Sequence, residues 1–305
     1  MRIASIDIGT NTILLLIAEV EGERVNPLFE METVVRLGEC VQENGILTKA
    51  AMDRGLQTLS QYLERCQAME VQEIFVVGTS ALREAKNSEG FLKLVKEKLN
   101  LSIKVISGEE EAQLSFLAVV KDLREVKEPI LVVDVGGGST EFILGRGNQI
   151  NQWISLPAGS VRLTEQFLRS DPVQEEDWGK MERKVRELLV DIPHPQDPLS
   201  MVAVGGTATT LASVEQGLEE FISEKIHHFV LKKVALKNQL FLYRSKTIEE
   251  RKKMPGLPPA RADVILAGGA ILYLAMEELK CPSVLISCHG IRYGLLYKRL
   301  NLIRK

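Results

Sequence analysis

Two short motifs of the same design constrain the fold of this chain more than any other feature of its sequence. In each motif an aspartate ends an apolar run, one or more glycines follow, and a second apolar run begins. Asp7 precedes Gly9 in the first motif, and Asp134 precedes Gly136 in the second. A motif that recurs in the same local context indicates a duplicated structural unit. We therefore expect two copies of one domain.

The segments around the two motifs follow the same order in both halves of the chain. Apolar runs predict three consecutive strands in each half, and alternating helices and strands follow them. The first-half strands are expected at residues 2–7, 12–20 and 33–37, with helices and strands at 48–68, 74–77, 88–99 and 104–106. The second-half strands are expected at 130–134, 140–144 and 149–156, with a later strand at 201–204 and a helix at 261–279. This order is typical of an α/β fold.

A polar segment at residues 120–129 separates the two halves and ends in Pro129. Chains longer than roughly 250–300 residues usually divide into domains, because a single core stops growing at that size. We predict domains at residues 1–124 and 125–305. The last helix, at about residues 291–303, is expected to pack back on the first domain.

The composition is that of a soluble globular protein, with 45% hydrophobic and 26% charged residues. The sequence has no signal-peptide pattern and no apolar run of the ~18 residues that a membrane span needs. We expect a cytoplasmic protein with no membrane and no nucleic-acid partner. The four cysteines show no CxxC spacing, so they are expected to be reduced core thiols and do not suggest a zinc site.

Charge is unevenly distributed along the chain, whose net charge is −3. Residues 224–305 hold 16 Lys and Arg against 6 Asp and Glu, a local balance of +10. Such an asymmetry suggests a polyanionic partner or substrate. The alternative is a solvated helical surface that is basic without a binding role.

The glycine turns can bind phosphate groups, because glycine lets an anion approach the backbone N–H groups closely. Two such turns would hold a polyphosphate from both sides, and a third glycine motif opens a helix, whose N-terminus attracts anions. Ordinary turns without a ligand are the alternative reading for all three. The predicted phosphate-binding residues are Gly9, Thr10 and Asn11 in the first turn and Gly136, Gly137, Gly138, Ser139 and Thr140 in the second. The third motif, Gly205, Gly206 and Thr207, is predicted to bind nucleotide or polyphosphate.

Three carboxylates lie close to these turns in sequence and predict a Mg²⁺ site. Mg²⁺ binds through one or two carboxylates, several waters and the phosphate oxygens of a substrate. Asp134 is the strongest candidate ligand, and Asp7 and Glu141 are the others. The alternative for Asp7 and Glu141 is a structural role, in which they cap turns or pair with a base.

The three glycine motifs resemble the phosphate and adenosine motifs of the superfamily that contains actin, sugar kinases and the seventy-kilodalton heat-shock chaperones. The chain as a whole resembles the exopolyphosphatase and guanosine pentaphosphate phosphohydrolase (Ppx/GppA) family. The segments that carry this resemblance are residues 4–11, 78–87, 106–112, 134–141, 155–165, 205–207 and 261–268. It implies two duplicated actin-like (ribonuclease H-like) domains with an active-site cleft between them. It also implies Mg²⁺-dependent release of orthophosphate from inorganic polyphosphate, or from guanosine pentaphosphate to give the tetraphosphate.

By this resemblance Glu111 matches the catalytic glutamate of the family. Ser107 and Glu110 form a capping-box pattern, which places Glu111 in the first turn of a helix, where the positive helix end favours the ionised carboxylate. An ionised glutamate can orient and deprotonate an attacking water. Arg83 matches the family arginine near the transferred phosphoryl group. The alternatives are a surface glutamate and a surface salt bridge.

The chain departs from the family pattern in one place. Family members commonly show Ser-Asp-x-Gly-hydrophobic-Arg-Glu-Gly there, whereas residues 287–294 carry Cys288 and Tyr293 in place of the two acids. His227 and His228 lie where family members often carry one histidine, and we interpret them as structural. The sequence ends at Lys305, without the C-terminal helical domains of longer members, so we expect a preference for polyphosphate of short or intermediate length.

Two other functions remain open at this point. A kinase of the same fold would transfer the ATP γ-phosphoryl group to an acceptor, since fold does not dictate function. A sensor that binds guanosine tetraphosphate or pentaphosphate without turnover would keep the glycine turns but would not need Glu111. A homodimer also remains open as an assembly.

Overall fold

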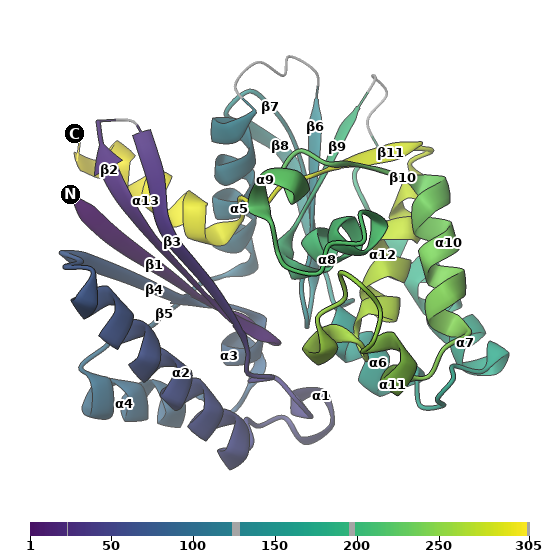
Figure 1. The fold of residues 1–305 in the computed structure, drawn as a ribbon, viewed down its shortest axis with the longest axis horizontal. Coiled ribbons are helices and arrows are strands. Elements are labelled where there is room, and N and C mark those ends of the chain that lie inside the picture. Colours follow the sequence, from purple (N-terminus) through teal and green to yellow (C-terminus); the bar gives the residue numbers. More distant parts are fainter. Residues whose placement is uncertain (23, 124–128, 195–198, 304–305) are drawn as a thin grey trace. The chain divides into compact units, whose positions relative to one another are not determined.

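A computed structural model describes residues 1–22, 24–123, 129–194 and 199–303 (Figure 1). The chain divides into two compact units. Unit 1 contains residues Met1–Lys121 and Ile291–Lys305, and unit 2 contains Asp122–Gly290. The predicted boundary at 124/125 lies outside the described residues, and the predicted domain limits remain a prediction.

Unit 1 is built on a five-stranded mixed sheet with the order β3-β2-β1-β4-β5. The first three strands are antiparallel to their neighbours, and β4 and β5 extend the sheet in parallel with β1. Its strands are β1 (Arg2–Ile8), β2 (Thr12–Glu21), β3 (Arg24–Val34), β4 (Glu73–Gly78) and β5 (Lys104–Val105). Its helices are α1 (Val41–Asn44), α2 (Lys49–Ala68), α3 (Ser80–Glu84), α4 (Ser88–Leu99), α5 (Gly108–Asp122) and α13 (Ile291–Ile303).

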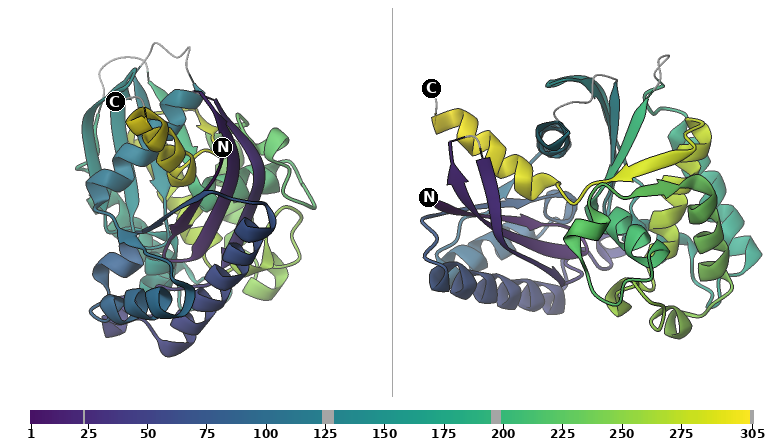
Figure 2. Two further views of the ribbon diagram at one scale, coloured as in Figure 1. Left: turned by 90° about the vertical axis from the view of Figure 1, so that its left-hand side faces the viewer. Right: turned by 45° about the horizontal axis from the view of Figure 1, so that its top comes forward.

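Helices cover both faces of the unit 1 sheet, as the ribbons in Figures 1 and 2 show. Successive side chains of a strand point to opposite faces, so β1 supplies both cores. Ala4, Ile6 and Ile8 belong to the core that α2 and α4 complete, whereas Ile3 belongs to the core that contains Ala118 of α5 and Leu296 of α13. Burial on both faces explains why β1 and β2 read as nearly continuous apolar runs.

Unit 2 repeats this plan in a six-stranded sheet with the order β10-β11-β9-β6-β7-β8. Here β6, β7 and β8 are antiparallel neighbours, β9 runs parallel to β6, and β11 runs parallel to β9. The strands are β6 (Ile130–Val135), β7 (Thr140–Arg146), β8 (Gln149–Leu156), β9 (Ser200–Val204), β10 (Val230–Lys232) and β11 (Ser283–Ile286). The additional edge strand β10 is antiparallel to β11.

Helix α12 (Ile265–Glu278) lies at the centre of the unit 2 core. It is apolar around most of its circumference, which is typical of a helix buried on all sides. It packs against α6 (Ser160–Phe167), α7 (Glu175–Leu189), α8 (Gly205–Glu215) and α10 (Lys233–Arg244). The remaining helices of the unit are α9 (Ser223–Ile226), α11 (Ile248–Arg251) and the 3-10 helix η1 (Pro259–Arg261).

The two sheets confirm the predicted α/β fold with duplicated actin-like domains, because three antiparallel strands followed by parallel ones recur in both. Most predicted elements are present, among them α4 and β8 with the expected limits and α2 with Thr48 as its N-cap. The predicted cleft between the domains stays a prediction. In the part of the chain that the structure describes, no helix has both the length and the hydropathy to cross a bilayer.

Two predicted elements were wrong in their limits. The third strand was expected at residues 33–37, whereas β3 covers Arg24–Val34 and pairs with β2 along its length. As an edge strand with mostly exposed side chains it has no apolar run that would mark it in the sequence. The helix expected from residue 261 begins at Ile265, because η1 occupies the preceding residues.

The structure contains no disulfide among the four cysteines, all of which lie in described segments, as their spacing predicted; the expected core position holds for Cys66 and Cys281, whereas Cys40 and Cys288 are only half-buried. Cys66 lies on the buried face of α2, and this burial raises the pKa of its thiol to about 11. A thiol with so high a pKa stays protonated and unreactive at neutral pH.

Candidate active site

In unit 1 three predicted site segments follow the carboxyl ends of adjacent parallel strands. Ile8 at the end of β1 pairs with Gly78 of β4, and Gly78 pairs with Val105 of β5. The turn Gly9–Asn11 follows β1, helix α3 with Arg83 follows β4, and helix α5 with Glu111 follows β5. Ligands of open α/β sheets bind at the carboxyl edge, so the sheet order brings these segments to the expected place.

The turn at Gly9–Asn11 is held mainly by its backbone. The N–H of Gly9 donates to the carbonyl of Thr12 at 2.9 Å, and the carbonyl of Asn11 accepts from Val35 and Arg36. Asn11 is buried, with 5% of its surface exposed. Among the described residues, neither Oδ1 nor Nδ2 of the Asn11 side chain finds a hydrogen-bond partner. A buried amide without a protein partner is unusual, and a bound ligand would explain it.

Glu111 and Arg83 form an ion pair at the same edge of the sheet. Arg83 Nη1 lies 3.0 Å from Glu111 Oε2, and it also donates to the carbonyl of Ile106 at 3.0 Å. The Glu111 side chain is only 8% exposed, whereas that of Arg83 is 27% exposed. The guanidinium therefore fixes a nearly buried carboxylate and keeps part of its own surface open to solvent.

The predicted capping box before Glu111 is present only in part. The N–H of Glu110 donates to Ser107 Oγ at 3.1 Å, which is the first half of the motif. The Glu110 carboxylate accepts hydrogen bonds from Lys104 and Lys298 rather than closing the box. These two lysines lower the pKa of Glu110, with the hydrogen bond from Lys104 as the largest cause. Glu111 lies in the first turn of α5, as predicted.

The second glycine turn, between β6 and β7, turns its carbonyl groups toward helix α6. The carbonyl of Gly136 accepts from the N–H of Ser160, and that of Gly137 accepts from Val161 at 3.0 Å. Arg162 Nε donates to the carbonyl of Gly138 at 2.6 Å. In a trans peptide the N–H points away from the carbonyl, so the N–H groups of the next residues point away from α6. These N–H groups can therefore donate hydrogen bonds to an anion on the side of the turn opposite α6.

Close packing explains why the second turn needs glycine nearby. A Cβ on Gly159 would lie 2.2 Å from the carbonyl oxygen of Gly137. Ser139 is buried, and the Thr140 hydroxyl donates to the carbonyl of Ala158. The hydroxyl of Thr140 thus has a structural partner, and the backbone is the part of this turn best arranged to bind phosphate.

Two of the three predicted metal ligands lie opposite each other in unit 2. Asp134 of β6 pairs with Glu141 of β7 in the antiparallel register, so both side chains point to the same face of the sheet. Ser155 Oγ donates to Glu141 Oε1 at 2.7 Å. Adjacent carboxylates repel each other unless a cation or a donor lies near them, and hard oxygen donors suit Mg²⁺. The donor chemistry of this pair therefore fits the predicted ion.

Asp7, the third predicted ligand, is buried on β1 in unit 1. In the part of the chain that the structure describes, one group of three or more His, Cys, Asp or Glu side chains is close enough to share an ion. That group is Asp122, His227 and His289, and it does not include the predicted ligands. Assignment of Mg²⁺ to Asp134, Asp7 and Glu141 therefore remains a prediction.

The third glycine motif begins helix α8 directly after β9, as predicted. Gly205 has φ +85°, and a Cβ there would lie 2.8 Å from Asp134 Oδ1, so glycine lets the turn approach this carboxylate. The Thr207 hydroxyl donates to the carbonyl of Val135 at 3.2 Å. The motif is thus fastened to the end of β6, beside Asp134.

Arg261 is a site residue to which the sequence analysis gave no role. It is buried, and a Cβ on Gly206 would lie 2.0 Å from Arg261 Nη2. A guanidinium beside a helix N-terminus adds a fixed positive charge to the N–H groups that favour an anion. Arg261 lies within a segment of family resemblance, but only the packing of η1 against α8 brings it to Gly206.

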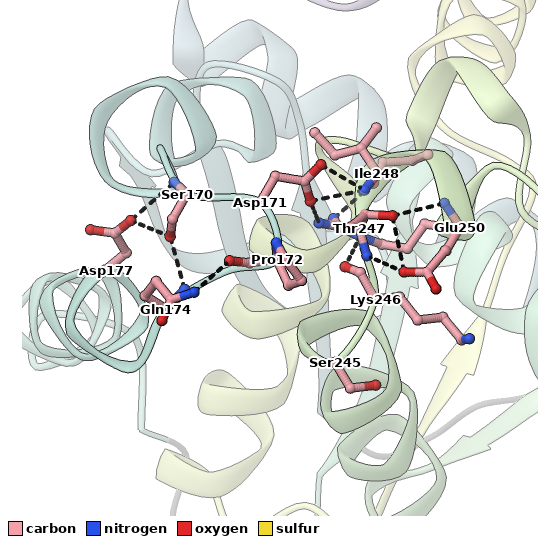
Figure 3. Close-up of polar contacts among 12 residues, drawn as sticks. Ser170, Asp171, Pro172, Gln174, Asp177, Ser245, Lys246, Thr247, Ile248 and Glu250 are labelled. Carbon is pink, nitrogen blue, oxygen red and sulfur yellow. Dashed lines mark hydrogen bonds and ion pairs between the residues drawn. The ribbon is translucent and has the colours of Figure 1, made fainter.

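A polar network shown in Figure 3 supports the segment that carries Arg261. The Asp171 carboxylate accepts from the N–H of Ile248 at 2.9 and 3.1 Å, and Thr247 and Glu250 form a capping box at the start of α11. Arg251, with 1% of its side chain exposed, lies 3.6 Å from Asp171 and donates to the carbonyl of Ala262 at 2.9 Å. The buried guanidinium thereby fixes the backbone next to Arg261.

The fold and the three glycine turns define an α/β protein of the actin-like superfamily. The chain belongs to the Ppx/GppA phosphatase family, whose family model matches residues 16–302. The predicted family is therefore confirmed.

Relatives with known names support this assignment. The chain is 34% identical to Exopolyphosphatase 2 of Mycobacterium tuberculosis in an alignment of 312 positions, which covers 96% of this chain and 97% of that protein. It is 39% identical over 296 residues to a bifunctional 3-dehydroquinate synthase/phosphatase of Fusobacterium nucleatum. That match covers 93% of this chain and 44% of the relative, so the chain spans less than half of the bifunctional protein.

Solved structures agree with the fold over nearly the whole chain. A Ppx/GppA family member of Aquifex aeolicus is 34% identical, with a TM-score of 0.85 and coverage of 100% of this chain and 99% of that one. An exopolyphosphatase of Cytophaga hutchinsonii is 29% identical, with a TM-score of 0.90 and coverage of 99% and 98%.

Proposed function

We propose that this protein is a phosphohydrolase that releases orthophosphate from the end of inorganic polyphosphate, and also from guanosine pentaphosphate. The Glu111–Arg83 pair carries the proposal. It lies at the carboxyl edge of the unit 1 sheet, with the glycine turn of Gly9–Asn11 on a neighbouring strand. A binding protein would need the turns but would have no use for a nearly buried carboxylate held by an arginine.

Glu111 is the proposed general base. Its carboxylate is ordered by Arg83, and in this position it can accept a hydrogen bond from water and take its proton during attack on a terminal phosphorus. The exposed part of the Arg83 guanidinium can contact phosphoryl oxygens at the same time. The glycine turns, Asn11 and Arg261 would hold the rest of the phosphate chain through N–H donors and positive charge.

Asp134 and Glu141 are the proposed holders of Mg²⁺, and Asp7 is proposed as a further ligand. When bound, the ion would neutralise charge on the phosphoryl oxygens. The chain's own contribution is to orient the two unit 2 carboxylates toward one face of the sheet and to place Gly205, which has no Cβ, beside the Asp134 carboxylate.

The assay that tests this function is phosphate release with Mg²⁺ and without any acceptor. Short polyphosphate, long polyphosphate and guanosine pentaphosphate are compared at matched concentrations, in low and in high KCl. We expect polyphosphate to be hydrolysed faster than the pentaphosphate, and we expect the rate to fall as salt rises. The +10 balance of residues 224–305 would attract a repeated anion, and salt screens this attraction beyond ~8 Å at physiological ionic strength.

Three results would contradict the proposal in different ways. Phosphate release that requires an acceptor would indicate a kinase. Tight pentaphosphate binding with no turnover would indicate a sensor. Faster hydrolysis of pentaphosphate, or a rate indifferent to salt, would leave a phosphohydrolase but refute the substrate preference.

A further inference from the structure

Three of the four histidines of this chain gather around one aspartate in unit 2. His227 Nε2 lies 3.3 Å from both carboxylate oxygens of Asp122. His289 Nδ1 lies 3.7 Å from Asp122 Oδ1, and His228 Nε2 lies 2.8 Å from Asp122 Oδ2. These distances bring the ring nitrogens of three histidines close to the carboxylate oxygens of Asp122.

Segments far apart in the sequence build this cluster. Asp122 is the last residue of α5, His227 and His228 follow α9, and His289 follows β11. The N–H of His228 donates to the carbonyl of Ile286 at 2.8 Å, and the N–H of Cys288 donates to His227 Nδ1 at 3.1 Å. The His227 ring stacks on those of His228 and His289, with centroid distances of 3.9 and 4.4 Å. The cluster is therefore a packed arrangement rather than a chance meeting of surface side chains.

Two of the three donor separations match those of a tetrahedral metal site. Donor atoms of Asp122, His227 and His289 all lie within 4.8 Å of one another. With metal–nitrogen and metal–oxygen distances of about 2.0–2.2 Å, two ligands of a tetrahedral ion are roughly 3.4 Å apart. Asp122 Oδ1 lies 3.3 Å from His227 Nε2 and 3.7 Å from His289 Nδ1, and these two distances lie on either side of that value.

We propose that Asp122, His227 and His289 bind one first-row transition-metal dication of the Zn²⁺ type, distinct from the Mg²⁺ of the proposed reaction. Two imidazoles and one carboxylate suit Zn²⁺, Ni²⁺ or Cu²⁺, whereas Mg²⁺ prefers oxygen ligands throughout. His228 bonds the opposite carboxylate oxygen and orients Asp122 without binding the metal, as the hydrogen-bond partners of metal ligands commonly do. A water would complete the tetrahedron.

Metal binding changes the tautomer of His227. In the metal-free ring Nδ1 accepts from the N–H of Cys288, so Nε2 carries the proton and donates to Asp122. A metal on Nε2 moves the proton to Nδ1, and the bond from Cys288 is lost. The N–H of Cys288 and the new Nδ1–H then face each other as two unpaired donors, which weakens affinity by about 10- to 100-fold.

The proposed ion would connect both ends of unit 2. Asp122 is the first residue of the unit, and His289 is next to its last residue, Gly290. His289 lies in the segment where the chain departs from its family pattern, beside Cys288. A ligand that binds the folded unit and joins its two ends stabilises it against unfolding.

The test measures metal content and thermal stability of the whole chain. The protein is stripped with a chelator, loaded with ZnCl₂, desalted and analysed for bound zinc, and melting curves are recorded with ZnCl₂ or MgCl₂. We expect one tightly held zinc per chain. At free Zn²⁺ one hundred times Kd, Tm should rise by roughly 5–10 °C for a unit of this size, and Mg²⁺ should give no such rise.

Two variants and one matched control locate the site. His289→Gln and Asp122→Asn each remove one ligand, whereas His194→Gln removes the remaining histidine, which pairs with Glu278 at 3.2 Å. We expect zinc and the Tm rise to be lost in the first two variants and kept in His194→Gln. Metal-free melting curves show whether a variant folds, and His289→Gln alone decides the question if Asp122→Asn does not fold. Zinc retained by His289→Gln, zinc lost from His194→Gln, or no zinc on the unaltered protein would overturn the proposal.

Discussion

Replacing Glu111 by glutamine tests the proposed base most directly. The amide has nearly the same shape as the carboxylate but cannot take a proton from water. Loss of a positioned general base lowers turnover by about 10²–10⁴. Since each factor of ten corresponds to about 1.36 kcal/mol, the barrier should rise by roughly 3–5 kcal/mol.

The same change should affect stability far less. In the Glu111→Gln variant Arg83 can still donate to the oxygen of the new side-chain amide, and only the charge-assisted part of the 3.0 Å contact is lost. Because Arg83 keeps 27% of its side chain exposed, solvent takes over part of the pairing, and we expect a loss of about 1 kcal/mol. The expected increase in the activation barrier is therefore clearly larger than the expected loss of folding stability.

The assay is phosphate release at saturating polyphosphate, together with substrate affinity and the thermal midpoint of each variant. Glu109→Gln is the matched control, because this exposed glutamate lies in the same first turn of α5 and carries the same charge. We expect Glu111→Gln to keep its affinity and lose turnover, and Glu109→Gln to remain close to the unaltered protein. Turnover within threefold of normal in Glu111→Gln, or an equal loss in the control, would refute Glu111 as the base.

Three further changes probe the metal ligands, an ion pair and the support of Arg261. Asp134→Asn should raise the Mg²⁺ concentration needed for activity, because an amide binds a hard dication less well than a carboxylate; an unchanged Mg²⁺ titration would place the ion elsewhere. Lys104 and Lys298 lower the pKa of Glu110 in the folded protein. The ionised carboxylate therefore stabilises the fold above its unfolded pKa of about 4.5, and this stabilisation is lost as the pH falls through the lower folded pKa. The Tm difference between the unaltered protein and Glu110→Gln should therefore shrink from pH 7 to pH 3, and a constant difference would contradict this. Arg251→Ala should lower the free energy of unfolding by about 1–3 kcal/mol, because it leaves the buried carbonyl of Ala262 without its donor, and urea unfolding would measure the loss.

Local pattern was sufficient to predict much of the fold. Helix α2 could be predicted from Thr48 and its apolar periodicity, because a helix start depends on residues within one turn. Apolar runs marked β1 and β6, whose side chains are buried on both faces. The repeat of Asp7 and Asp134 before glycine indicated duplication, and the five strands of the unit 1 sheet have counterparts in the same order in the unit 2 sheet. Strand β3 was misplaced because its exposed edge position leaves no such pattern.

Contacts between distant segments were decided only by the tertiary structure. Arg83 meets Glu111 because β4 and β5 are neighbours, and Arg261 meets Gly206 because η1 packs beside α8. His227 and His289 meet Asp122 at a point where three segments converge. The apolar periodicity of a helix or strand predicts which of its faces is buried, because the pattern depends only on the element's own residues. It does not report which element lies against that face, because strand order and helix packing are set by the free energy of the whole chain.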